Sequence, residues 1–327
     1  MGKRTILTVF LVFALISALV TPYFGPKLMS PLLIFTDAFE RDIFWRMRVP
    51  RVCTGFVVGA ALALSGMVFQ AMFRNPLATP FTLGVASGGS LGAALAIRLG
   101  LSFTPLGLSP QAWCAFAGCL LSIILVASLT WRQRGVSTGT MLLAGVAVNF
   151  FFVALILFIQ YTSDIADAAS LMRWLVGGLN IGTFESLSTV VPLIALGAAV
   201  VFLFTDELNV LSLGDELAAG RGVNVATAKK ILFVSTSLMV GGVVSICGPI
   251  GFVGMMVPHL ARLMVGADHR YLTIATFLFG GAFLALCDSA ARSLYAPAEI
   301  PVSVITALLG GPFFLVLLLR RAHQGRL

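Results

Sequence analysis

The chain has 327 residues, of which 59% are hydrophobic and 10% are charged, whereas soluble domains carry about 25% charged residues. This composition excludes a soluble globular protein. The formal net charge of +8 does not predict nucleic-acid binding, because the basic residues lie scattered between apolar segments. The five cysteines show no CxxC spacing, so they indicate neither a metal site nor a disulfide framework. The lipid bilayer is the environment that this composition favours.

Apolar segments long enough to cross the hydrocarbon core as helices recur along the whole sequence. They lie at residues 5–24, 52–72, 82–98, 111–131, 138–160, 187–205, 227–247, 250–267, 271–290 and 300–319. The first resembles a signal peptide, but it leads into more membrane, which favours a retained span. The seventh and eighth are divided by Gly248 and Pro249 alone, and without that break the count falls to nine. We predict an all-α, polytopic integral membrane protein with about ten transmembrane helices in a single domain, 1–327.

The basic residues predict the orientation of these spans. With both termini in the cytoplasm, twelve basic residues lie in inner segments and eight in outer ones, which agrees with the positive-inside rule. The inner twelve are Lys3, Arg4, Arg74, Arg132, Arg134, Arg221, Lys229, Lys230, Arg270, Arg320, Arg321 and Arg326. The outer eight are Lys27, Arg41, Arg46, Arg48, Arg51, Arg98, Arg173 and Arg292. Five of the outer eight precede the second span, so that segment departs from the rule.

This outer segment ends in Trp45-Arg46-Met47-Arg48-Val49-Pro50-Arg51, directly before the second span. Cations at an outer helix mouth favour contact with an acidic partner. The alternative is that they anchor the chain to lipid phosphates beside Trp45. Asp288 lies close in sequence to Arg292, and an ion pair between them is the simple interpretation.

The longest inner connection, residues 206–226, carries the pattern of a two-helix elbow. Ser212 or Gly214 can begin a short helix whose first turn holds two acidic residues, which are favourable against the helix dipole. Two glycines can end it and turn the chain. We predict a rigid cytoplasmic docking element rather than a plain connector. Its expected contact residues are Leu213, Gly214, Asp215, Glu216, Gly220, Arg221 and Gly222.

Signatures of covalent chemistry are missing from the sequence. No G-x-x-x-x-G-K-[ST] pattern occurs, so ATP is not bound through a phosphate loop of this chain. His259 and His269 stand without a second ligand at metal spacing, which favours structural histidines. We expect no catalytic residues, no metal and no cofactor.

Several motifs occur together in an order that resembles one family, the iron-chelate, haem and cobalamin permeases of bacterial ABC importers. The resemblance covers nearly the whole chain. Its motifs are Arg48-Val49-Pro50-Arg51, the run from Gly59 to Gly66, Asn75 to Pro80, Leu213-Gly214-Asp215-Glu216, Gly251 to Gly254 with Pro258-His259, and Glu299-Ile300-Pro301 through Thr306 to Gly310.

The resemblance implies a type II importer permease in the bacterial inner membrane. It implies a homodimer with two ATP-binding cassette subunits below, received by a coupling elbow at 206–226, and a periplasmic substrate-binding protein above. Arg48, Arg51 and Arg292 would meet acidic residues of that binding protein. The path would lie at the dimer axis, where the fifth span, with Gly145 and Asn149, is our candidate for a lining helix.

The family suggests an iron chelate, either a siderophore or haem, as the cargo, with cobalamin as the alternative. ATP hydrolysis would occur on the separate subunits. An ion-coupled secondary transporter is the alternative from another class, but it would need ionisable residues at mid-depth of its spans, where this sequence has almost none. A membrane-embedded enzyme would need a cluster of His, Asp or Glu at matched depth, which His259 lacks.

Overall fold

The computed structural model describes residues 2–131, 138–179 and 184–323, and within these ranges it consists of helices and their connections, without a β-strand. The predicted all-α fold is confirmed. Each of the ten predicted spans corresponds to a helix, with boundaries that differ by up to four residues. These helices are α1 (Lys3–Val20), α4 (Val49–Phe73), α5 (Val85–Arg98), α6 (Pro110–Trp131), α7 (Thr138–Thr162), α9 (Phe184–Leu203), α12 (Val225–Cys247), α13 (Val253–Val265), α14 (His269–Ser293) and α15 (Val302–His323).

Seven helices of the described chain are long and apolar enough to cross a membrane. By contrast, α5 and α13 have 14 and 13 residues, so each rises only about 20 Å, less than the hydrocarbon thickness of about 30 Å. The break between α12 and α13 is real, because Gly248 ends α12 with a φ of +66° and Phe252 precedes α13 with a φ of +67°. Both conformations are incompatible with a continuous right-handed helix.

Shorter helices occupy the connections. They are α2 (Pro31–Thr36), α3 (Ala38–Ile43), α8 (Ile165–Val176), α10 (Thr205–Leu211), α11 (Asp215–Gly220), and the single turns η1 (Thr21–Tyr23), η2 (Phe44–Arg48), η3 (Pro80–Leu83) and η4 (Pro105–Gly107). Helix α8 was not predicted from the sequence. Its signals were present, since the Asp164 side chain accepts a hydrogen bond from the Asp167 amide and Gly177 ends the helix with a φ of +72°.

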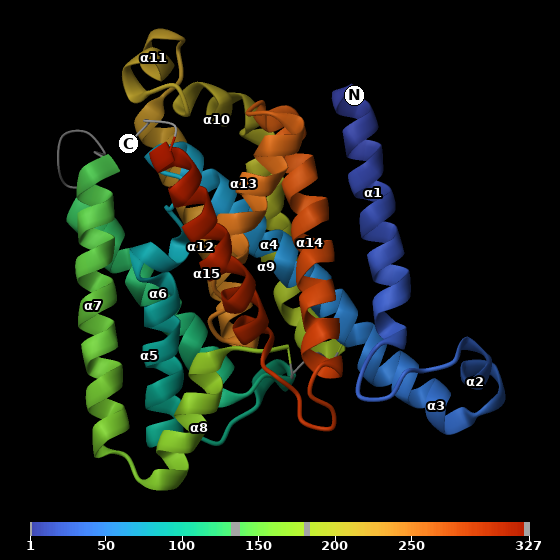
Figure 1. Ribbon diagram of the computed structural model, residues 1–327. Coiled ribbons are helices and arrows are strands. Elements are labelled where there is room, and N and C mark those ends of the chain that lie inside the picture. Colours follow the sequence, from blue (N-terminus) through green and yellow to red (C-terminus); the bar gives the residue numbers. More distant parts are fainter. Residues whose placement is uncertain (1, 132–137, 180–183, 324–327) are drawn as a thin grey trace.

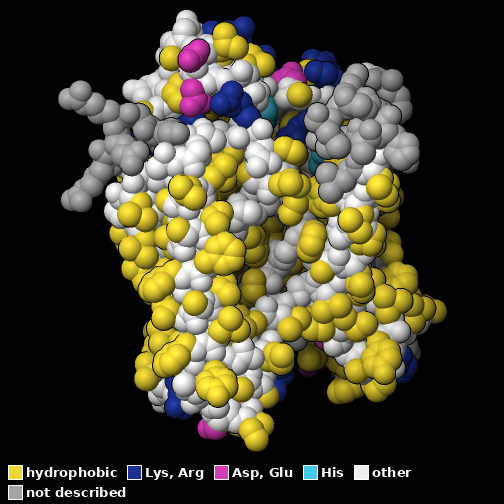
Figure 2. Space-filling model, turned by 60° about the vertical axis from the view of Figure 1, so that its left-hand side comes forward, with side chains coloured by type: hydrophobic (Ala, Val, Ile, Leu, Met, Phe, Trp, Pro, Cys, Tyr) yellow, Lys and Arg dark blue, Asp and Glu magenta, His cyan; other side chains and the backbone are white. Residues whose placement is uncertain are grey.

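The helices form one bundle with two distinct ends (Figure 1). One end, called the elbow end below, carries α10, α11, the start of α1 and the end of α15. The opposite end, called the arginine end, carries α2, α3, α8 and the connection from α14 to α15. Figure 2 shows apolar side chains covering the band between the ends, with charged side chains gathered at the ends themselves. This distribution fits a bilayer around the middle of the bundle.

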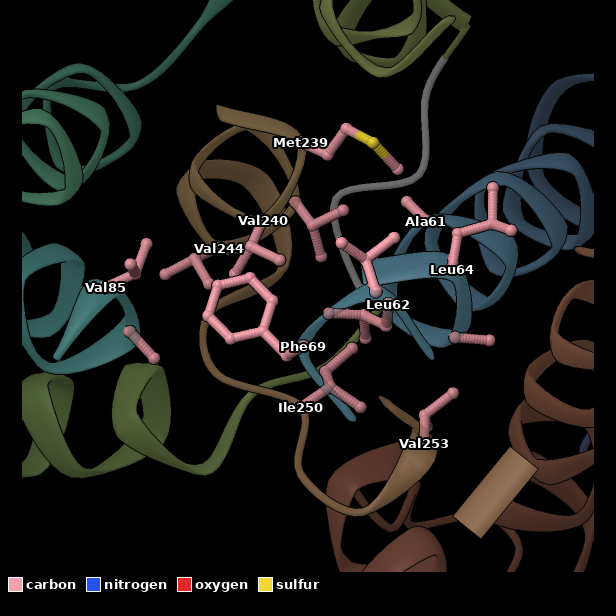
Figure 3. Packing of buried hydrophobic residues seen from close by; sticks show 14 of the residues in the cluster. Ala61, Leu62, Leu64, Phe69, Val85, Met239, Val240, Val244, Ile250 and Val253 are labelled. Carbon is pink, nitrogen blue, oxygen red and sulfur yellow. The ribbon is translucent and has the colours of Figure 1, made fainter. Parts of the chain in front are cut away.

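Helix α4 lies at the centre of the bundle, and its residues 58–73 are all buried. Figure 3 shows side chains of α4, including Leu62 and Phe69, meeting those of α5, α12 and the turn before α13. Glycines bring the backbones together, because a methyl group at Gly66 would overlap the carbonyl of Gly254 on α13. Small residues matter here since lipid supplies no hydrophobic drive for helices to associate.

Candidate functional site

The three arginines that the sequence analysis assigned to docking lie together at the arginine end. Arg48, Arg51 and Arg292 line one cavity of about 370 Å³, which Lys27 and Arg46 also line. Glu299 contributes the acidic group of this lining. The fold thus gathers residues from η2, α4 and α14 into a strongly basic pocket.

A buried carboxylate holds two of these arginines. Asp288, whose side chain is 2% exposed, lies 3.0 Å from Arg51 Nη2 and 3.0 Å from Arg292 Nε. The predicted pair of Asp288 with Arg292 is therefore confirmed. Arg51 has a second partner, Glu299 Oε2 at 2.8 Å, which the sequence analysis did not foresee. Arg51 and Arg292 are consequently partly neutralised within the chain, and Arg292 is only 3% exposed.

Arg48 is held in a different way. Its guanidinium donates hydrogen bonds to the backbone carbonyls of Pro22, Tyr23 and Lys27, at 2.8 to 3.2 Å. Carbonyl oxygens fix the position of the group but leave its formal charge in place. Of the three predicted docking residues, Arg48 is therefore held by backbone carbonyls, whereas Arg51 and Arg292 pair with a carboxylate. Arg46, which pairs with Asp42 at 3.6 Å while remaining 80% exposed, adds to the same field.

A second cavity has a volume of about 570 Å³ and is called the path cavity below, because a residue predicted to line the path lies in its wall. It is lined by η3, the first turns of α5, one side of α7 and the turn between α12 and α13. The predicted path residue Asn149 lines it. Gly145, the other predicted path residue, instead packs against Leu83, so closely that a methyl group there would overlap the Leu83 side chain. Figure 2, in which α7 comes forward, shows this face of the molecule hollowed along its middle.

The wall of this path cavity carries polar groups but no formal charge among the residues that line it. The polar lining residues are Thr79, Thr82, Ser87, Ser90, Asn149 and Gln160. Local hydrogen bonds fix Thr79 and Thr82 relative to each other. The Thr82 hydroxyl donates to the Thr79 carbonyl at 2.6 Å, and the Thr79 backbone amide donates to the Thr82 hydroxyl at 3.3 Å. Such a wall can contact an amphipathic solute through hydroxyl and amide groups without trapping it by charge.

The segment predicted as an elbow consists of α10 and α11. Gly214 precedes α11, Asp215 and Glu216 occupy its first turn, and the chain turns at Gly222 with a φ of +83°. Leu213 and Leu217 are 55% and 59% exposed at this tip. Gly220 and Arg221 are also exposed, whereas Asp215 is bound within the chain by Lys229 Nζ at 2.6 Å. Exposed leucines beside Glu216 form a surface suited to another protein.

Side-chain contacts fasten α10 to the start of α14. Asp206 Oδ1 lies 2.8 Å from Arg270 Nε, and this hydrogen bond lowers the pKa of the Asp206 carboxyl. The side-chain amide of Asn209 donates to the Asp268 carboxylate at 3.2 Å and accepts a hydrogen bond from the backbone N–H of His269 at 2.8 Å. Burial acts to raise the pKa of Asp268, but hydrogen bonds from Arg270 and Asn209 and the charge of Lys3 lower it. The elbow is therefore anchored at its α10 side.

Two of the three histidines in the sequence, His259 and His269, contact neighbouring side chains. The backbone N–H and the ring of His269 both contact the Asn209 side chain. The ring of His259 packs against the ring of Phe313, with 5.8 Å between the ring centroids. Within residues 2–131, 138–179 and 184–323 no group of three or more His, Cys, Asp or Glu could hold a metal ion.

Comparisons with known proteins agree with this architecture. Residues 6–320 match the model of the FecCD transport family. The chain is 38% identical to the hemin transport system permease protein HmuU of Yersinia pestis, over 98% of this chain and 97% of that protein. It is 41% identical to the cobalamin import system permease protein BtuC of Halobacterium salinarum, over 88% of this chain and 76% of that protein.

A solved structure of a metal-chelate type ABC transporter in an inward-facing conformation superposes with a TM-score of 0.88 and 33% sequence identity. The superposition covers 97% of this chain and 99% of that one. The likeness therefore extends over almost the whole bundle. On the family match, the near-complete alignment with relatives and the shared fold, this chain belongs to the FecCD transport family of ABC importer permeases.

Proposed function

We propose that this chain is the permease subunit of an ATP-driven importer for an iron chelate, either a siderophore or haem, which a periplasmic binding protein delivers. The observation that carries the proposal is the match to the hemin permease over almost the full length of both chains. Cobalamin is the alternative cargo, and the 41% identity to a cobalamin permease supports it.

The placement of the three candidate surfaces supports vectorial transport. A basic pocket lies at one end, an uncharged cavity lies in the bundle, and exposed leucines lie at the other end. In the proposed cycle the arginine end receives the loaded binding protein and the cavity passes the cargo. The elbow moves when the ATPase subunits bind or hydrolyse ATP. Switching the cavity between the two sides is a rigid-body rearrangement of packed helices.

The assembly in this proposal contains a second copy of the chain, two ATP-binding cassette subunits and one binding protein. The chain is a multi-pass protein of the inner membrane with both termini in the cytoplasm, so the elbow faces the ATPases. Leu213, Leu217 and Glu216 supply the exposed contact surface. Arg48 supplies the charge for the binding protein, while Arg51 and Arg292 support it from the buried cluster around Asp288.

The cavity wall favours a large amphipathic chelate as cargo. A solute of this kind buries apolar surface and needs a few hydrogen bonds, which the hydroxyl and amide groups of the wall supply. An ion-coupled secondary transporter would bind its coupling ion at ionisable groups near the midplane. Among the residues that line this cavity no ionisable side chain occurs, which favours an ATP-driven importer over an ion-coupled transporter.

The proposal is tested by reconstituting the chain with its ATPase and binding protein in liposomes. ATP hydrolysis is then measured with haem, a ferric siderophore and cobalamin in turn. Stimulation by an iron chelate, together with ATP-dependent uptake of that chelate, is the expected result. Stimulation by cobalamin alone would move the assignment to the alternative cargo. Uptake that persists without the ATPase and follows an imposed proton gradient would refute an ATP-driven importer.

A further inference from the structure

One buried ammonium group joins three helices at the elbow end. Lys229, in the second turn of α12, is 1% exposed. Its Nζ donates to Asp215 Oδ2 at 2.6 Å and to Thr138 Oγ1 at 2.9 Å. Asp215 is the first residue of α11, and Thr138 is the first residue of α7. A single side chain therefore links the elbow, α12 and α7.

The chemistry of this contact makes it firm. An ammonium group buried without partners is strongly unfavourable, so it stays where its charge is paired and its N–H groups donate hydrogen bonds. Asp215 pairs the charge and accepts one hydrogen bond, and the Thr138 hydroxyl accepts a second. Because the Asp215 side chain is 36% exposed, the link runs from the surface of the elbow into the interior of the bundle.

The α7 end of the link belongs to a helix that lines the path cavity farther along its length. Helix α7 begins at Thr138, and Asn149, Val153 and Gln160 of the same helix line the cavity. Eleven residues separate Thr138 from Asn149, a rise of about 16 Å along a continuous helix. A displacement of α11 that pulls on Lys229 is thus delivered to the near end of a helix that forms the cavity wall. The α10 side of the elbow is held separately, on α14.

We propose that Lys229 is a positioning residue that carries movement of the elbow to α7 and so couples nucleotide events to the path cavity. This inference rests on the proposed function, in which the elbow receives the ATPase. It assigns a task to a charged residue that the docking surfaces and the cavity wall do not use. The Lys229 side chain is 1% exposed, which closes it to direct contact with cargo or ATPase.

The test uses Lys229→Met in the complete transporter in liposomes, with ATP hydrolysis and cargo uptake measured on the same preparation. We expect hydrolysis to continue while uptake per ATP falls by about tenfold, within the range of a coupling free energy between two sites. Lys230→Met is the matched control. It removes the same charge from the next residue, whose ammonium lies over the Trp131 ring at 5.2 Å, and we expect uptake per ATP to stay at the wild-type level.

A second variant and a distance measurement test the link between α11 and α7 independently of Lys229→Met uptake. Thr138→Val removes only the hydroxyl at the α7 side, so it is expected to lower uptake per ATP even if Lys229→Met fails to assemble. Spin labels at Glu216 and Gly139 report the separation of α11 and α7, which should stay constant through the nucleotide cycle in the wild type and vary in Lys229→Met. Wild-type coupling in both variants would overturn the link. Absence of ATP-dependent uptake in the wild-type complex would instead refute the importer assignment.

Discussion

Replacing Asp288 by asparagine removes the carboxylate that lies between Arg51 and Arg292. Both guanidinium groups are 3.0 Å from it, and the side chains of Asp288 and Arg292 are 2% and 3% exposed. Removing one partner of a buried ion pair costs about 3–5 kcal/mol, because the other charge stays buried without compensation. At about 2 °C per kcal/mol for a chain of this size, the apparent thermal midpoint should fall by roughly 6–10 °C.

The protein carries its own reporters for this measurement. Cys119, Cys247 and Cys287 are free and buried, so a thiol-reactive dye labels them as the bundle opens. Cys287 directly precedes the substituted residue and is 4% exposed. A temperature ramp in detergent with such a dye gives the midpoint, while Cys53 and Cys114, which are partly exposed, contribute a baseline at low temperature.

Two controls separate burial from charge. Asp42→Asn removes a carboxylate that is 63% exposed and pairs with Arg46, and an exposed pair contributes about 0–1 kcal/mol. Arg51 keeps its pair with Glu299 at 2.8 Å when Asp288 is neutralised. Adding Arg292→Gln to Asp288→Asn removes the cation that loses its carboxylate partner, so the double variant should be less destabilised than the sum of the single changes. A midpoint for Asp288→Asn within about 2 °C of wild type, or less than 1 kcal/mol, would refute the reasoning.

The remaining predictions concern the two docking surfaces and the packing of α4. Leu217→Ser, at an elbow residue that is 59% exposed, should lower the amount of ATPase that co-purifies with the permease while leaving its thermal midpoint unchanged; full recovery of the ATPase would argue against docking at the elbow. Arg48→Glu should weaken binding of the binding protein by roughly tenfold at low salt, with a smaller loss as salt rises, and equal weakening by Arg41→Glu in surface plasmon resonance would show a nonspecific charge effect. Gly66→Leu should abolish recovery of folded protein in size-exclusion chromatography, because its side chain would overlap the α13 backbone. Gly311→Ala, where a methyl group meets nothing within 4 Å, should elute as wild type, and normal elution of Gly66→Leu would contradict the packing.

The helices of this protein were predictable because their signals are local. An apolar run long enough to cross the bilayer forms a helix whatever its neighbours are, since its backbone groups must be satisfied internally. The turns between helices follow from single residues in the same way. Gly248 separates α12 from α13, and Asn224 caps α12 by accepting a hydrogen bond from the Thr227 amide at 3.1 Å. The helix α8 was missed although its capping residues are visible in the sequence.

The candidate sites were predictable in part. The sequence placed Arg48 and Arg51 at one helix mouth and Arg292 near another, and the family resemblance joined them. The pairing of Arg51 with Asp288 could not be predicted from the sequence, because the two residues are 237 positions apart. The sequence also could not tell which of the two predicted path residues lines the path cavity. Asn149 lines it, whereas Gly145, one helical turn away, packs against Leu83.

The sequence by itself determined that the chain crosses the membrane many times, which segments are helical and which family its motifs resemble. Tertiary structure alone decided which charges are neutralised and which stay available. Lys229 and Lys230 are adjacent in the sequence, yet one ammonium is buried against Asp215 and Thr138 while the other lies over Trp131. The physical reason is that hydropathy acts on each segment separately, whereas an ion pair or a close glycine contact exists only after distant helices have packed.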